Sequence, residues 1–134
     1  EISAAGNVCP SIITNNPSVR EHYKTRQTVV FVDGGYRDVL VQARDRVHRG
    51  HLLVTHPLMG SLKPNETPYR SVILGDEILA RADADSVMII EEAILVFDRF
   101  AVTARPDRGE GATEKMKEDF REIDLSLLKS AMNE

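Results

Sequence analysis

The chain has 134 residues, of which 42% are hydrophobic and 28% are charged, and its formal net charge is -4. This composition predicts one ordinary globular domain over residues 1–134 and excludes a chain that is disordered throughout. No run of Lys and Arg stands out, so nucleic acid is not an expected partner. No apolar stretch approaches the roughly 20 residues of a membrane helix, and no secretory signal is evident, so we expect a cytoplasmic protein without membrane contact.

The first elements follow from short apolar runs separated by turn residues. Residues 1–10 predict an irregular N-terminal extension, in which the single cysteine, Cys9, cannot form an internal disulfide. Residues 11–14 predict a strand. Asn16 is suited to cap a helix that opens at Pro17 and continues through Tyr23. The β-branched and aromatic run 28–32 then predicts a buried strand.

Apolar residues at helical spacing predict a helix over 36–49, which Gly50 ends as a C-terminal cap. Residues 52–55 predict a third strand. The resulting β-α-β-α-β order with short connections is typical of a parallel sheet with right-handed crossovers.

The second half of the chain predicts one more strand and two further helical segments. The strand is expected at 71–74 and a long helix at about 85–104, followed by a loop at 105–112. Thr113 is suited to cap the last helical segment, which Asp124 is expected to interrupt. The predicted fold is a single-domain three-layer α/β sandwich, with a short, mostly parallel sheet of about four strands and helices on both faces.

Three loops are expected at the carboxyl ends of the parallel strands, where ligands bind in open α/β sheets. They comprise residues 15–17, 33–35 and 56–69. Because parallel strands end at the same edge of a sheet, we expect these loops to be neighbours in space.

The loop from His56 to Tyr69 is the main candidate site. It contains three of the six prolines of the chain, which restrict its backbone and favour a preformed shape. The candidate ligand-binding residues combine a titratable ring, a cation, a carboxylate and neutral polar groups, and they are Asn15, Asn16, Gly34, Gly35, His56, Ser61, Lys63, Asn65, Glu66 and Tyr69. Structural alternatives stay open, since polar loop residues also satisfy the loop's own backbone, and asparagines and glycines also serve as caps and turns.

No metal or cofactor is expected. His51 and His56 flank a predicted strand that separates them by roughly 16 Å, so they cannot share an ion, and His48 and His51 lack an evident third ligand. Asp33 follows a strand, as a ribose-binding acid does, but the glycine fingerprint of a dinucleotide site is missing.

The long helix predicted at 85–104 carries apolar residues at helical spacing along one face, its main stripe. Further apolar residues, Met88, Ile89 and Leu95, lie outside that face. Core packing explains most such residues, and a helix-mediated homodimer is the alternative explanation.

The amino-acid sequence of the candidate loop resembles that of the GrdX family. The resemblance rests on Val47–Leu58, Gly60-Ser61 and Lys63–Tyr69, with further likeness at Thr14–Pro17, Asp38–Leu40 and Arg44-Asp45, and it covers residues 11–74. Members of this family are small proteins encoded beside the glycine, sarcosine and betaine reductase genes of anaerobic bacteria. The resemblance implies an accessory role in amino-acid reduction and supplies no catalytic residues.

Two hypotheses follow. The first is a non-catalytic accessory protein whose 56–69 loop binds a reductase component or a small polar or anionic ligand. The second is a small enzyme that uses His56 as an acid or base, Lys63 as an anion binder and Glu66 to orient one of them.

Overall fold

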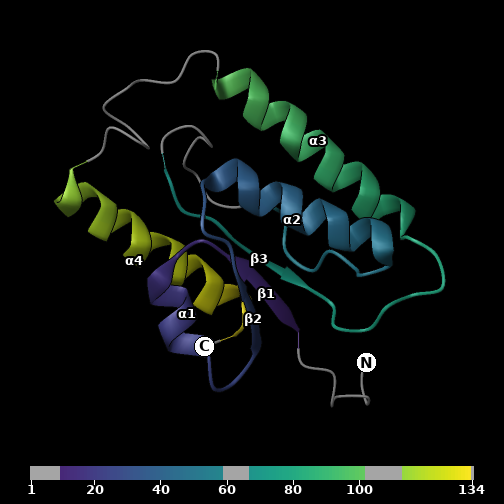
Figure 1. The fold of residues 1–134 in the computed structure, drawn as a ribbon, viewed down its shortest axis with the longest axis horizontal. Coiled ribbons are helices and arrows are strands. Elements are labelled where there is room, and N and C mark those ends of the chain that lie inside the picture. Colours follow the sequence, from purple (N-terminus) through teal and green to yellow (C-terminus); the bar gives the residue numbers. More distant parts are fainter. Residues whose placement is uncertain (1–9, 59–66, 102–112, 134) are drawn as a thin grey trace.

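The computed structural model describes residues 10–58, 67–101 and 113–133, which form four helices and three strands (Figure 1). Most of the predicted N-terminal extension, with Cys9, and the predicted loop at 105–112 lie outside these ranges. The elements in chain order are β1 (Ser11–Thr14), α1 (Pro17–Tyr23), β2 (Thr28–Phe31), α2 (Tyr36–Arg49), β3 (Ser71–Leu74), α3 (Ala84–Ala101) and α4 (Glu114–Ala131).

Three helix ends form as the sequence predicts. The Asn16 side chain accepts a hydrogen bond from the backbone N–H of Ser18 and so caps α1. Gly50 ends α2 with a φ of 119°, a left-handed conformation that glycine adopts without strain. The Thr113 hydroxyl accepts from the N–H of Met116 and caps α4.

The sheet has the strand order β2-β1-β3, and it is mixed rather than mostly parallel. β1 pairs with β2 in parallel and with β3 antiparallel. The prediction of about four strands is wrong for residues 52–55, which make only an isolated bridge between Leu53 and Leu74 on the outer side of β3. The chain that leaves residues 52–55 turns back and enters β3 in the opposite direction, which makes β3 antiparallel to β1.

Side chains interrupt the pairing of residues 52–55 with β3. The N–H of Ile73 donates to the Thr55 hydroxyl at 3.0 Å, and the N–H of Leu53 donates to the Ser86 hydroxyl at 3.0 Å. Ser86 lies in α3. Because these hydroxyls take the places of backbone partners, a regular ladder does not form.

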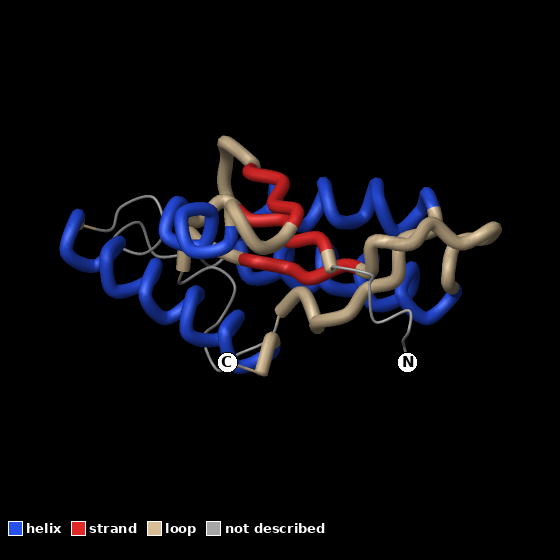
Figure 2. The backbone as a smooth tube through the Cα atoms, turned by 90° about the horizontal axis from the view of Figure 1, so that it is seen from below, coloured by secondary structure: helices blue, strands red, loops and turns tan. Residues whose placement is uncertain are grey.

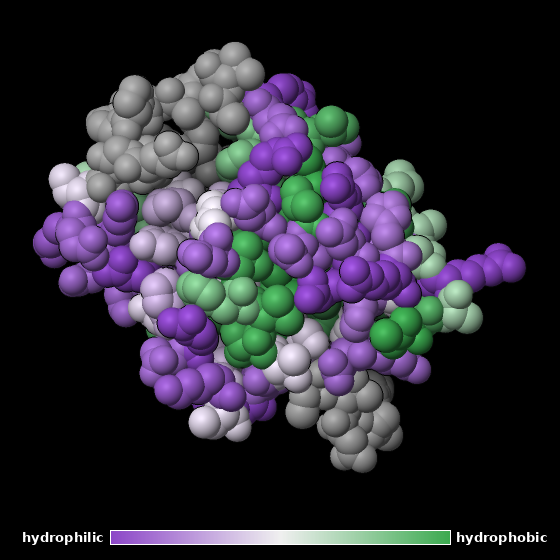
Figure 3. Space-filling view, viewed as in Figure 1, coloured by the Kyte–Doolittle hydropathy of each residue, from purple (hydrophilic) through white to green (hydrophobic). Residues whose placement is uncertain are grey.

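The prediction that residues 28–32 form a buried strand is also only partly correct. β2 is an edge strand, and Val29, Val30 and Phe31 are half-buried while Val32, just beyond the strand, is buried. Figure 3 shows the face of the molecule that is turned to the viewer in Figure 1, with an apolar patch at its centre, over the sheet.

Helices cover both faces of the sheet, as predicted. On one face α2 and α3 pack over Ile13, Val72 and Leu74. On the other face α1 and α4 pack over Ile12 and Ile73. The two sets of apolar residues alternate along β1 and β3, as expected for strands that are buried on both sides. Figure 2 shows the strands between the helical layers.

α4 is continuous, so the predicted interruption at Asp124 is wrong. Asp124 is buried in the middle of this helix. Its carboxylate accepts hydrogen bonds from side chains of other elements and leaves the backbone of α4 intact.

On α3, the apolar residues outside the main stripe are exposed, with Met88 at 69% and Leu95 at 64%. The helix-mediated homodimer therefore stays a prediction.

No helix within the described ranges is both long and apolar enough to cross a membrane.

Candidate functional site

The ends of three chain segments meet at Asn15, directly after β1. The buried Asn15 side chain donates from Nδ2 to the carbonyl oxygens of Gly34 at 3.0 Å and Pro68 at 2.8 Å. Its Oδ1 atom accepts from the N–H of Arg70 at 3.0 Å. The start of α2 and the chain before β3 therefore lie at the same end of the sheet, as Figure 1 also shows. We call this region the polar end.

Asn16 connects the polar end to α4. While its Oδ1 caps α1, its Nδ2 donates to the carbonyl oxygen of Arg121 at 2.9 Å and to Asp124 Oδ2 at 3.1 Å. The same Asp124 oxygen accepts from the Ser71 hydroxyl at 2.7 Å, and Ser71 also shares a hydrogen bond with Thr14. Asn15 and Asn16 thus use their polar atoms in structural hydrogen bonds.

Gly34 and Gly35, two of the candidate ligand-binding residues, each make a hydrogen bond within the protein. The carbonyl of Gly34 accepts from Asn15, and the N–H of Gly35 donates to Asp38 Oδ2 at 2.8 Å. The Asp38 carboxylate, in the first turn of α2, thus takes the place that an anion would occupy at the Gly35 amide.

Arg70 is the residue of the polar end that sequence reasoning missed. It is 3% exposed, and its guanidinium carbon lies 5.2 Å from the centre of the Tyr36 ring. The ring of Phe97, from α3, also stacks on the Tyr36 ring, with the two ring centres 5.1 Å apart. Arg70 follows the proline-rich loop and precedes an apolar strand, and its sequence context gives no signal that the guanidinium turns inward.

Two nitrogens of the Arg70 guanidinium, Nε and Nη1, are buried and have no hydrogen-bond partner. Asp124 Oδ1 is likewise buried without a partner. These two groups carry opposite charges but form no ion pair with each other among the contacts of the described residues. The polar end therefore contains both a cationic and an anionic group whose hydrogen bonding is incomplete.

The electrostatics of both groups act on Tyr36, the first residue of α2. Burial raises the pKa of the Tyr36 hydroxyl above its ordinary value, and the negative charge of Asp124 raises it further, while Arg70 opposes the shift. Tyr36 therefore stays protonated and uncharged at neutral pH.

Tyr69 joins the end of the candidate loop to α4. Its hydroxyl accepts a hydrogen bond from Arg121 Nη1 at 3.0 Å, and Arg121 also pairs with Glu114 at 3.0 Å. The N–H of Tyr69 donates to the Thr67 hydroxyl. Tyr69 is thus held from both sides by hydrogen bonds.

His56 is exposed, and its ring bonds within its own loop. The N–H of Leu58 donates to His56 Nδ1 at 3.1 Å, so Nδ1 acts as an acceptor. Four other candidate residues, Ser61, Lys63, Asn65 and Glu66, lie outside the described residues. The structure therefore brings together Asn15, Gly34 and the backbone at Pro68 and Arg70.

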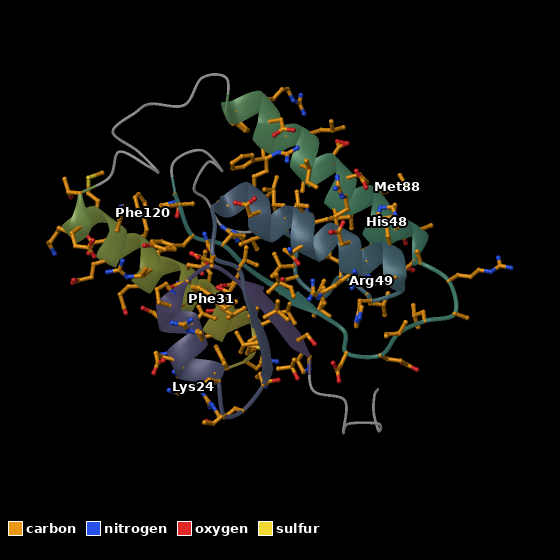
Figure 4. All side chains as sticks on the ribbon, viewed as in Figure 1. Lys24, Phe31, His48, Arg49, Met88 and Phe120 are labelled. Atoms are coloured by element: carbon orange, nitrogen blue, oxygen red, sulfur yellow. The ribbon has the colours of Figure 1, made fainter. Side chains whose placement is uncertain are left out.

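Two further histidines, His48 and His51, make structural contacts. His48 pairs with Glu91 at 2.9 Å between α2 and α3, and the His51 ring bonds to the carbonyl oxygen of Gly75 at 2.7 Å. Figure 4 shows His48 and Met88 far from Phe120 of α4. No group of three or more possible metal ligands occurs among the described residues.

A shallow hollow of about 490 Å³ lies elsewhere on the surface, between α1 and α4. It is lined by Pro17, Ser18, Glu21, His22 and Leu125, and it is open to solvent. None of these residues belongs to the predicted site, and only Leu125 is buried.

The fold and the polar end define a small α/β protein with a mixed three-stranded sheet, helices on both faces, and loop ends held together by buried amides. The chain belongs to the GrdX-like family, because the profile described as GrdX-like protein matches residues 11–133. This match confirms the resemblance at residues 11–74 and extends it through α3 and α4. No curated protein and no solved structure shows a significant match to the chain.

Proposed function

We propose that this protein is an accessory of the glycine, sarcosine and betaine reductase system. In this role its 56–69 loop binds a reductase component or a small polar or anionic ligand. Membership of the GrdX-like family is the observation that carries the proposal. The amino-acid reduction chemistry then belongs to the reductase, and this protein supports it from outside the active site.

The anchoring of the loop ends is consistent with such a binding role. Pro57 is buried, Pro68 is tied to Asn15 through its carbonyl oxygen, and Tyr69 is tied to Arg121. A segment fixed at both ends loses less conformational entropy when it binds, which favours affinity.

The alternative, a small enzyme built on His56, gains no support from the described residues. His56 Nδ1 is engaged by the N–H of Leu58, and the ring is exposed rather than placed in a cleft. The proposed helpers of this histidine, Lys63 and Glu66, are not among the described residues, so we keep the accessory role as the proposal.

Affinity capture from native extract of an anaerobe that encodes the reductase tests the proposal. We expect the tagged wild-type protein to recover a reductase component, identified by mass spectrometry, and the Lys63→Ala variant to recover less of it. Lys24→Ala is the matched control, because Lys24 is an exposed lysine at the end of α1 (Figure 4). Recovery of no reductase component, together with no ligand-induced thermal shift, would contradict the proposal.

A further inference from the structure

Two of the three guanidinium nitrogens of Arg70, Nε and Nη1, are buried and have no hydrogen-bond partner. Nε carries one N–H and Nη1 carries two, so most donors of the guanidinium are buried without an acceptor. An arginine does not lose its proton in a folded protein, so the charge persists. Buried charges are normally paired, because an unpaired one loses its hydration without compensation.

The surroundings of Arg70 supply only part of this compensation. The centre of the Tyr36 ring lies 5.2 Å from the guanidinium carbon, and the charge of Arg70 and a side-chain hydrogen bond with it lower the pKa of Tyr36, so this tyrosine is one partner of the guanidinium. The backbone N–H of Arg70 already donates to Asn15. No ion pair joins a described carboxylate to the guanidinium, and the bonded oxygen of Asp124 accepts from Asn16 and Ser71.

The electrostatic field at this position favours an anion. Tyr36 is the first residue of α2, a helix of 14 residues, so the guanidinium lies beside the positive end of that helix's dipole. The positive end of the helix dipole and the charge of the arginine both attract an anion. One acidic side chain, Asp38, already accepts a hydrogen bond from the N–H of Gly35.

We propose that Arg70 forms a binding site for a small organic carboxylate at the polar end. The carboxylate accepts hydrogen bonds from the guanidinium, whose planar set of donors matches the planar carboxylate group. Asp124, also buried and with an unpartnered oxygen, makes a singly charged anion a better fit than a dianion such as phosphate, since a second negative charge would be repelled. The site goes beyond the proposed accessory role and does not depend on it.

Thermal unfolding of the full chain in sodium acetate, compared with sodium chloride of equal ionic strength, tests this site. We expect acetate to raise the Tm of the wild type by about 4 °C at concentrations well above Kd, and chloride to have a smaller effect. Arg70→Met is expected to fold with a Tm no lower than the wild type in chloride, since it removes an uncompensated charge, and to lose the acetate response. Arg20→Met is the matched control, because Arg20 also lies over an aromatic ring, that of Phe31, but is exposed.

Line broadening of ¹³C-labelled acetate by the wild-type protein gives a second measurement that does not need a stable variant. Broadening that unlabelled acetate reverses and that Arg70→Lys weakens supports the site. The proposal is overturned if acetate causes neither broadening nor a Tm shift beyond that of chloride, or if Arg70→Met keeps the full response. A larger stabilisation by inorganic phosphate than by acetate would overturn the assignment to a monocarboxylate. Because the test uses the isolated protein, its failure leaves the capture of a reductase component unaffected.

Discussion

At the scale of single residues, Asn15 joins three segments through one buried amide. It donates to the carbonyl oxygens of Gly34 and Pro68 and accepts from the N–H of Arg70. We expect Asn15→Ala to lower the free energy of unfolding by about 2–3 kcal/mol, because three hydrogen bonds are lost and their partners are left without replacements. Urea unfolding followed by circular dichroism measures this change.

A control for Asn15 is available on the exposed face of α2. Gln42 is exposed, and its side chain accepts a hydrogen bond from Arg46 one turn away. We expect Gln42→Ala to change the free energy of unfolding by less than about 0.5 kcal/mol. Equal losses in the two variants would show that the Asn15 amide has no special structural role.

The raised pKa of Tyr36 predicts a pH dependence of stability in alkaline solution. In the unfolded chain this hydroxyl ionises near its ordinary value of 10.0, whereas burial raises the pKa in the folded chain. Its contribution to stability is complete below pH 10.0 and is lost as the pH rises through the folded pKa. Between the unfolded and the folded pKa of Tyr36, the free energy of unfolding falls by at most about 1.4 kcal/mol per pH unit.

Tyr36→Phe isolates this contribution, because phenylalanine keeps the ring stacked on Phe97 and lacks the hydroxyl. Urea unfolding at several pH values from about 9 to about 11 should give a flatter dependence for the variant than for the wild type. Parallel curves for the two proteins would mean that the Tyr36 hydroxyl ionises equally in the folded and unfolded chains.

Residue patterns predicted the helix caps but not the polar network. Asn16 and Thr113 are recognisable because a cap depends on the few residues that follow it. The contact from Asn16 to Asp124 joins residues 108 positions apart, and no local pattern carries that information. The burial of Arg70 is equally non-local, since it depends on Tyr36 and Phe97 from two other elements.

At the scale of elements, Gly50 shows how closely the end of α2 is packed. Its φ of 119° suits glycine, and a Cβ atom there would lie 2.5 Å from the carbonyl oxygen of Leu79. We expect Gly50→Ala to destabilise the protein by roughly 2 kcal/mol or more, from backbone strain and this clash together. Differential scanning calorimetry of the variant measures the loss as a lower Tm.

Gly75 serves as the control for Gly50, because a Cβ atom there would meet Leu52 at 3.6 Å or more, an ordinary contact distance. Gly75→Ala is therefore expected to be neutral, or to stabilise by up to about 1 kcal/mol through the unfolded state. Similar losses in both variants would contradict the role assigned to the left-handed cap.

The docking of α4 on the sheet depends on Asp124. Asp124→Ala removes the acceptor of Asn16 and Ser71 inside the protein, and we expect a loss of about 3 kcal/mol. Asp124→Asn keeps one acceptor oxygen and should cost less than half as much. If urea unfolding shows the two variants to be equally unstable, the loss comes from the charge and not from the hydrogen bonds.

Most elements were predictable from apolar spacing, but the sheet order was not. Parallel pairing of β1 and β2 agrees with the β-α-β pattern. Residues 52–55 have the composition of a strand, yet β3 takes the place beside β1. That choice depends on the long connection before β3 and on the hydroxyls of Thr55 and Ser86, which compete with backbone partners.

At the scale of the whole molecule, helices cover both faces of the sheet, and the end of β1, the start of α2 and the chain before β3 meet at the polar end (Figure 1). The family was predictable because the amino-acid sequence of residues 47–69 is distinctive. The match over residues 11–133 confirms that family. The activity was not predictable in the same way, because the described polar side chains mostly serve the fold. An accessory role is the proposal that agrees with both observations.

Reductase activity in cells is the most direct test of that role. The measurement compares glycine, sarcosine or betaine reduction in extracts of a parent anaerobe, a strain lacking this protein, and the same strain complemented with the wild type. We predict lower activity in the deletion strain and recovery on complementation, while the purified reductase components remain active without the protein. Unchanged reduction in the deletion strain would contradict the accessory role.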